Sequence, residues 1–260
     1  EMEKMNRKLL NISVIALMCC ILIPIASVGG QGIPNSDTLS IVTFGSPETI
    51  DPHWAYDTAS GELIQNLYEP LCMFDGPSAE AYLPAIADWW PGLGTNPGNA
   101  ITPIKPGFDG YEETWLFRIR TNVPWHDSKY GYVTPADVEY SFERGMFFDH
   151  TAGPMWMLYE PLLAGGSSYD FDKDGDGTLN AAEYLKLDEA VDKAIQCNAT
   201  HVWFNLVGPY APFQQILCQT WSEVMCKQWC IDHGLWKGIH KDYADFMRTW
   251  DLPEPGPLME

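Results

Sequence analysis

Basic side chains are scarce in this sequence. Its 260 residues include 15 Lys and Arg against 35 Asp and Glu, which gives a formal net charge of −20. An electrostatic field of this sign repels phosphate backbones and argues against a nucleic-acid partner. The acidic excess attracts cations and basic solutes, but it is also what the solvated surface of an ordinary soluble protein provides.

The sequence patterns of several large enzyme classes are absent as well. No GxSxG nucleophile motif, no HExxH metal motif and no phosphate-binding loop occurs. Scattered His and Asp residues do not make a catalytic triad by themselves. We therefore expect a protein that is not an enzyme, and a secreted metalloenzyme is the weakest alternative.

Long apolar runs are limited to one, from Leu9 to Ile25, which follows the basic residues Lys4, Arg7 and Lys8 and precedes small residues. The run falls short of the roughly 20 residues that span a bilayer comfortably. This order predicts a secretory signal peptide over residues 1–30, with an uncleaved N-terminal anchor as the alternative. The protein is thus expected to be exported to the periplasm, the cell surface or the medium.

Beyond residue 30 the sequence holds an odd number of cysteines: Cys72, Cys197, Cys218, Cys226 and Cys230. Export permits one or two disulfides, and the pairing is open at this point. Two of these cysteines, together with His233 and His240, also allow a zinc site to be drawn. Buried thiols are the commoner fate of such residues.

Three short segments predict β-strands, because each is rich in β-branched residues or alternates between apolar and polar ones. They are Thr38 to Phe44, Glu113 to Arg120 and His201 to Val207. Four segments predict helices from their apolar periodicity: Gly61 to Leu71, Thr134 to Met146, Ala181 to Ile195 and Gln214 to Cys230. The irregular alternation of strands and helices predicts an α/β or mixed α+β fold.

Two of the predicted helices carry more detail. In the first, five apolar residues recur at helical spacing and are expected to face inward: Leu63, Ile64, Leu67, Tyr68 and Leu71. In the second, Thr134 is expected to cap the helix in a capping box with Asp137. That helix presents three apolar residues along one face: Val138, Phe142 and Met146.

The stretch DKDGDGTLNAAE, residues 172–183, matches an EF-hand-type calcium loop at every position that matters. Carboxylates stand at positions 1, 3, 5 and 12, a glycine at position 6 permits the tight turn, and position 7 offers its carbonyl. The predicted calcium ligands are therefore Asp172, Asp174, Asp176, Thr178 and Glu183. The alternative is an Asp-Gly turn that never holds a metal.

The surroundings of this loop favour a structural ion over a calcium sensor. No second loop of this kind occurs, and Ala164 to Ser168 is a poor candidate for an entry helix. A sensor exposes a helix-lined groove when it opens, and this context does not offer one. Extracellular calcium is abundant, so even a weak site can hold a loop in place.

Five blocks, in this order, resemble the extracellular solute-binding protein family 5, the peptide- and nickel-binding receptors of ABC importers. They are LSIVTFGSPETIDP, LIQNLYEPL, YLPAIADWW, TWLFRIRTNVPWHDSKYGYVTPADVEYSFERG and HVWFNLVGPYAPFQQIL. The fourth block is the most specific, because it is similar to a strand ending in arginine, a turn with an aromatic-polar-Asp step and a capped helix. It departs from the family at Asp127-Ser128, where the family usually has Asp-Gly, and in the added KYGY.

The resemblance implies the N-terminal part of a two-lobed clamshell, with residues 31–260 as a partial solute-binding domain. The second lobe, which in this family usually supplies the acidic anchor for a peptide amine, is missing. A receptor of this kind buries a solute between its lobes, and hinge closure then signals to a permease at the membrane. No bond is broken in the process.

The resemblance places the ligand cleft after the first predicted strand, at the loop from Asp51 to Ala59. Trp54 and Tyr56 are candidate ligand-binding residues there, because their rings can cover a ligand while their polar tips form hydrogen bonds. Trp221 is a third candidate. The chain has 34 aromatic residues (11 Trp, 12 Tyr and 11 Phe), and most such residues serve packing, which is the alternative for all three.

Two functions follow. The leading hypothesis is an exported substrate-binding protein of an ABC transporter that captures peptides, or a related small solute, and carries a structural calcium ion. The alternative is an extracellular calcium-binding protein on a truncated, transport-inactive solute-binding scaffold.

Overall fold

The computed structural model describes residues 37–40, 42, 45–90, 110–148, 153–163, 171–238 and 242–250. The chain divides into two units, Glu1–Thr43 and Phe44–Glu260. The predicted signal peptide lies outside the described residues. The predicted strand from Thr38 to Phe44 is wrong at the positions that are described, 38–40 and 42, because none of them is in strand conformation.

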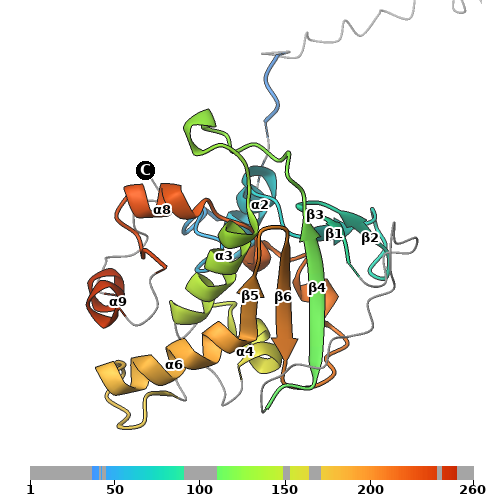
Figure 1. Ribbon diagram of the computed structural model, residues 1–260. Coiled ribbons are helices and arrows are strands. Elements are labelled where there is room, and N and C mark those ends of the chain that lie inside the picture. Colours follow the sequence, from blue (N-terminus) through green and yellow to red (C-terminus); the bar gives the residue numbers. More distant parts are fainter. Residues whose placement is uncertain are drawn as a thin grey trace, which may run out of the picture. The chain divides into compact units, whose positions relative to one another are not determined.

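The second unit is built on a four-stranded antiparallel sheet with the order β3-β4-β6-β5 (Figure 1). Its strands are β3 (Ala87–Trp89), β4 (Glu113–Ile119), β5 (Ile195–Cys197) and β6 (His201–Leu206). The two strands that the sequence predicts in this region, β4 and β6, are confirmed and pair along their length. Within the described residues, the fold is therefore of the mixed α and β class that the sequence predicts.

Helices α3 (Pro135–Phe147) and α6 (Ala181–Ala194) pack against β5 and β6 (Figure 1). Between the helices and the sheet lies a cluster of aromatic rings in edge-to-face contact. The ring of Phe204 on β6 lies with its centroid 4.9 Å from that of Phe142, 5.7 Å from that of Phe117 and 5.6 Å from that of Phe213. All four side chains are buried, and such pairs stabilise the core beyond the area they remove from water.

Helix α3 begins where the sequence predicts. The Asp137 carboxylate accepts hydrogen bonds from the backbone N–H of Thr134 at 2.8 Å and from its hydroxyl at 2.6 Å. The predicted apolar face is buried, but so are the polar residues Ser141, Glu143 and Arg144. The helix therefore runs through the interior rather than along the surface, which a single apolar stripe does not predict.

A second, two-stranded sheet pairs β1 (Cys72–Phe74) with β2 (Tyr82–Pro84). It follows helix α2 (Thr58–Leu67), which begins three residues earlier than predicted because Asp57 caps it through the Ser60 N–H. The helix ends before Pro70, as expected for a segment that approaches a proline. The predicted inward stripe is wrong for Leu63 and Leu67, which are 41% and 46% exposed.

The predicted helix from Gln214 to Cys230 is also wrong as a single element. It is divided into α7 (Phe213–Ile216), the 3₁₀ helix η2 (Thr220–Ser222) and α8 (Lys227–Asp232). Between η2 and α8 the backbone N–H of Val224 donates to the Glu69 carbonyl, and that of Met225 to the Ser141 hydroxyl. These tertiary hydrogen bonds replace the helical ones.

The remaining elements of the described residues are η1 (Ser128–Tyr130), α4 (Trp156–Leu162) and α9 (Tyr243–Trp250). Among the residues that the structure describes, no helix is both long enough and apolar enough to cross a membrane.

Candidate functional site

A buried ion pair fixes the start of the predicted ligand loop to the core. Arg144 on α3 donates from Nη1 to Asp51 Oδ1 at 2.8 Å and from Nη2 to Asp51 Oδ2. Its Nη1 also lies 3.0 Å from Nδ1 of His53. The Asp51 carboxylate further accepts the backbone N–H of His53 at 3.0 Å. The guanidinium and the carboxylate therefore satisfy each other in a site that excludes water.

Each member of this cluster has one dominant protonation state. Burial opposes ionisation of Asp51, but the Arg144 guanidinium outweighs it and lowers the pKa of the carboxyl group. Burial and the same guanidinium lower the pKa of His53 to about 3. The imidazole is therefore neutral near pH 7, and its Nδ1 can accept a hydrogen bond from Arg144.

Two of the three predicted ligand residues lie together. The rings of Tyr56 and Trp221 meet edge to face, with centroids 6.0 Å apart and an interplanar angle of 75°. Tyr56 is 52% exposed. Trp221 belongs to η2, which contacts α2, and Trp54 is half-buried two residues before Tyr56. Nothing in these contacts distinguishes a ligand surface from ordinary packing, so the assignment stays a prediction.

A cavity of about 1050 Å³ lies in the second unit, and none of these three residues lines it. Its wall is formed by the end of α2, strand β1, the turn before α3 and the segment from Cys218 to Cys230. Aromatic side chains contribute much of the lining: Tyr68, Phe74, Trp125, Tyr130 and Trp229. This volume is at the upper end of the range for small-molecule sites.

Among the described residues, three acidic side chains line the cavity, Glu69, Asp127 and Glu223, and no Lys or Arg does so. Glu223 is 2% exposed, and its Oε2 has no hydrogen-bond partner among the described residues. Burial, with a contribution from the nearby Glu69 carboxylate, raises the pKa of Glu223 to about 9. The carboxyl group is therefore protonated in the folded protein at neutral pH.

The raised pKa of Glu223 predicts a pH-dependent stability. Because its ordinary pKa is 4.5 and its folded value about 9, the folded state holds a proton that the unfolded state releases between these limits. Stability contributed by this group is thus complete below about pH 4.5 and is lost as the pH rises toward 9. Glu223→Gln cannot ionise, and at pH 8 we expect it to raise the free energy of unfolding by on the order of 2 kcal/mol.

Urea unfolding of both proteins between pH 5 and pH 9 measures this difference. Glu62→Gln, which changes an exposed carboxylate on α2, is the matched control and should follow the wild-type curve. Wild-type and Glu223→Gln curves that run parallel over the whole range would show that Glu223 ionises normally.

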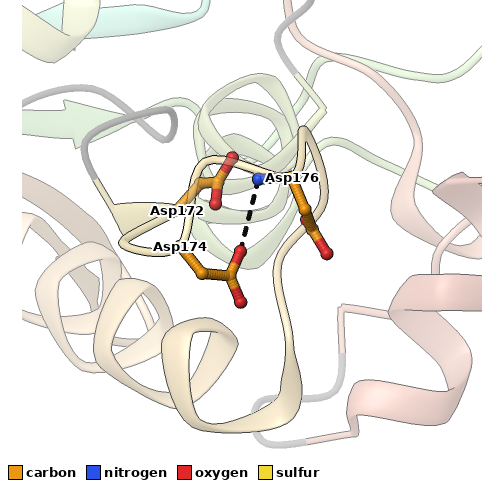
Figure 2. A group of neighbouring side chains, drawn as sticks. All are labelled: Asp172, Asp174 and Asp176. Carbon is orange, nitrogen blue, oxygen red and sulfur yellow. Dashed lines mark hydrogen bonds between the residues drawn. The ribbon is translucent and has the colours of Figure 1, made fainter.

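The predicted calcium loop brings three of its ligands together. Carboxylate oxygens of Asp172, Asp174 and Asp176 all lie within 4.8 Å of one another (Figure 2). Their positions are set by backbone donors: Asp172 accepts the N–H of Gly175 at 2.7 Å and that of Gly177 at 2.9 Å. These hydrogen bonds lower the pKa of the Asp172 carboxyl group, and the bond from Gly177 contributes the most. Its carboxylate is thus charged at neutral pH.

Glycine is required at two positions of this turn. Gly175 and Gly177 adopt φ angles of +72° and +87°, which L side chains rarely adopt. The asparagine at position 9, Asn180, caps α6 by accepting the backbone N–H of Ala182 and Glu183. The tight turn and the helix start are thus both encoded by the twelve residues of the motif.

The remaining predicted ligands, Thr178 and Glu183, lie at the exit of the loop. Glu183 accepts the Lys173 N–H at 2.7 Å through Oε1 and the Asn180 N–H at 3.1 Å through Oε2, so its carboxylate reaches back to the loop's first turn. The Thr178 hydroxyl donates to Asp176 at 2.8 Å. The loop is anchored below by Leu179, which is buried and whose carbonyl accepts the Tyr243 hydroxyl at 2.8 Å.

This donor set fits calcium. All of the groups are oxygen donors, and Ca²⁺ binds oxygen at about 2.3–2.6 Å, so two of its ligands can be up to about 5 Å apart. The observed separations of the three carboxylates are within that limit. Within the described residues these aspartates are the only group of three or more metal-ligating side chains found together.

The alternative zinc site gains no support from the described residues. The Cys226 sulfur accepts the Trp229 N–H at 3.4 Å, Cys230 is buried, and His233 bonds through Nδ1 to the Trp229 carbonyl at 2.7 Å. They do not converge on one point. His240 lies outside the described residues.

Sequence reasoning did not find the cavity. Its lining comes from five separate stretches of sequence, and no local pattern marks Glu223 as a buried carboxyl group. The one available signal is Trp125, which stands in the aromatic-polar-Asp turn of the most specific family block.

No protein-family model matches this sequence. No curated protein matches it either.

The solved structures that the chain resembles include peptide-binding receptors. The structure of the pheromone receptor PrgZ, described with its mode of peptide binding, is 20% identical, with a TM-score of 0.49 over 74% of this chain and 31% of that chain. The ABC transporter-associated periplasmic binding protein DppA of Helicobacter pylori, in complex with the peptide STSA, is 20% identical, with a TM-score of 0.44 over 79% of this chain and 32% of its own.

OppA of Burkholderia pseudomallei is 17% identical, with a TM-score of 0.48 over 73% of this chain and 30% of its own. The chain thus spans about a third of the length of the solved structures that it resembles. Since all of these TM-scores are below 0.5, the function of this chain has to be inferred from its own residues.

Proposed function

We propose that this chain is part of an exported solute-binding protein that captures peptides for an ABC importer and holds a structural calcium ion. One observation is the main support for this proposal. The buried ion pair joins Asp51, in the block LSIVTFGSPETIDP, to Arg144, in the block that ends in SFERG. Two segments that resemble the same receptor family, 93 residues apart, thus depend on each other for charge compensation.

The other family blocks meet in the same way. Strand β3, from YLPAIADWW, pairs with β4, from TWLFRIR, and β4 pairs with β6, from HVWFNLV. Glu69, in LIQNLYEPL, accepts the backbone N–H of Val224. Blocks that resemble one family and also form one core support a common origin better than separate short matches do.

The proposed receptor function gives the ion pair a mechanical role. Arg144 holds the start of the segment 51–57, while the ring of Tyr56, near the end of that segment, remains exposed. In a clamshell receptor, a bound peptide pairs its backbone with protein edges, and roomy pockets take its side chains. The cavity beside Trp125 and Trp229 is one candidate pocket. Closure on the peptide would then be recognised by a permease at the membrane.

The calcium ion would be held by the carboxylates of Asp172, Asp174, Asp176 and Glu183 and by the carbonyl of Thr178. When bound it supplies a positive charge that offsets the repulsion among these carboxylates, and it performs no chemistry. Leu179 below the loop and the cap of α6 beside it would be held more firmly as a result.

Peptide titration monitored by tryptophan fluorescence tests the proposal. A mixture of short peptides should saturate the signal of the full chain, and Trp221→Ala should weaken binding about tenfold or more, as expected for a buried aromatic contact. The same reasoning applies to Trp54→Ala. Trp156→Ala, which removes a half-exposed ring on α4, is the matched control and should leave the affinity unchanged. Equal peptide affinities for all variants would show that neither Trp221 nor Trp54 belongs to the binding site.

A further inference from the structure

Two cysteines far apart in the sequence meet inside the second unit. Cys72 opens β1, and Cys218 follows α7. Their sulfur atoms are 3.4 Å apart, and the two residues are 146 positions apart. Both side chains are buried, with 0% and 7% exposure. A sulfur–sulfur bond is about 2.05 Å long, so the two sulfur atoms would have to approach each other by roughly 1.4 Å to form one.

The other cysteines of the described chain have different neighbours. Cys197 donates to the Glu139 carboxylate at 3.2 Å, and the Cys226 sulfur accepts the Trp229 N–H. Cys230 lies against Tyr140. Cys72 and Cys218 are thus the cysteine pair in sulfur contact among the described residues, and the neighbours of the other three are not cysteine sulfurs in the contacts given above.

We propose that Cys72 and Cys218 form a disulfide in the exported protein. The inference uses only the export part of the proposed function and does not depend on peptide binding. An exported chain meets an oxidising compartment, in which such a pair is stable. The bond would tie the two-stranded sheet to the segment that carries Trp221 and Glu223 and would fix one wall of the cavity.

Formation of the Cys72–Cys218 bond requires an oxidant, and a disulfide such as oxidised glutathione can serve as one. One cysteine of the pair, as its thiolate, attacks the oxidant and releases one glutathione. The second cysteine then displaces the other glutathione from the mixed disulfide. Two S–H bonds are lost and one S–S bond forms in the protein, while the two electrons and two protons appear in two glutathione thiols.

The environment of Cys72 and Cys218 determines at which stage of folding the disulfide can form. Contact with Cys218 and burial both raise the pKa of Cys72 well above its ordinary value, which disfavours the attacking thiolate in the folded protein. Cys218 also donates to the Gln214 carbonyl at 3.3 Å. Oxidation should therefore be rapid during folding, before the pair is buried, and slow afterwards.

Peptide mapping of the full chain, purified from an oxidising compartment and alkylated without reductant, tests the bond. We expect one cross-linked peptide pair containing Cys72 and Cys218, and alkylated Cys197, Cys226 and Cys230. Alkylation of both proposed partners, or cross-linking to any other cysteine, would overturn the proposal. Because the mapping uses the wild-type chain, it gives an answer even if cysteine variants fold poorly.

A second measurement reads the effect of the bond. Reduction with dithiothreitol, or the change Cys72→Ala with Cys218→Ala, should lower the melting temperature by roughly 5–10 °C, and reduction should add nothing in the double variant. Cys197→Ala is the matched control and should retain the response to reductant. Refolding of the reduced chain with oxidised glutathione should form the bond, whereas the folded reduced chain should react at least tenfold more slowly.

These results separate the two proposals. A chain that carries the bond but binds no peptide contradicts the receptor function alone. A chain that binds peptide with both thiols free contradicts the disulfide alone.

Discussion

Replacing Arg144 with Met is expected to lower the free energy of unfolding by about 3–5 kcal/mol, since it leaves a buried carboxylate without its counter-charge. The side chains of Arg144 and Asp51 are 9% and 5% exposed, so water cannot take over the lost hydrogen bonds. Methionine keeps most of the apolar stem of arginine, and the loss therefore reports the charge rather than a cavity. Asp51→Asn should cost a similar amount by stranding the guanidinium.

The pair Arg118–Asp88 is the matched control for this prediction. Its bond length is 2.7 Å, but its side chains are 39% and 36% exposed. Arg118→Met should therefore change the free energy of unfolding by less than about 1 kcal/mol. Urea unfolding with equal m-values measures both changes. If Arg144→Met cost no more than Arg118→Met, the ion pair would not hold the family blocks together.

Millimolar calcium is expected to raise the melting temperature of the protein by roughly 3–10 °C. A site with a dissociation constant of about 10–100 µM contributes about 1.4–2.7 kcal/mol at 1 mM Ca²⁺. The effect arises because the unfolded chain lacks the turn that gathers Asp172, Asp174 and Asp176. Removal of the ion with a chelator should reverse it.

Asp174→Asn separates metal binding from loop folding. In the described contacts its carboxylate accepts only a weak bond at 3.3 Å from the Asp176 N–H, which an amide oxygen can also accept. The variant should therefore keep the melting temperature of the calcium-free protein but lose most of the calcium-dependent rise. Asp75→Asn removes the same charge at an exposed hairpin position and should retain the full rise. An unchanged calcium response in Asp174→Asn would exclude the loop as the binding site.

The calcium response also distinguishes a structural ion from a sensor. We expect the peptide affinity to change by less than about twofold between saturating calcium and chelator, because the loop does not belong to the described cavity lining. A tenfold change would assign the ion a regulatory role.

The sequence predicted those elements whose own residues determine them. Strands β4 and β6 follow from the residues of their own segments, and the start of α3 follows from its capping residue, Thr134. Helix α6 begins at Ala181, where the sequence predicts it. The turn at residues 172–177 belongs to the same group, because its glycines and carboxylates are neighbours in the sequence, while calcium binding there stays a prediction. In each case the determining contacts are local.

The predictions failed where distant contacts decide the outcome. The segment from Gln214 to Cys230 has helical periodicity, but backbone bonds from Val224 and Met225 to other segments divide it. Leu63 and Leu67 have the spacing of a buried stripe, yet both are exposed. The ion pair, the cavity and the Cys72–Cys218 contact were likewise beyond sequence reasoning, because each joins residues separated by more than 90 positions or drawn from several segments.

Native mass spectrometry of the full chain, purified gently after export, tests the central claim most directly. We predict one calcium ion per chain and, in the same spectrum, a family of peptide adducts that a defined short peptide displaces. The calcium adduct serves as an internal proof that the protein is folded. A spectrum with the calcium adduct but with no peptide adduct, even after millimolar peptide is added, would contradict the receptor function and favour the calcium-binding scaffold.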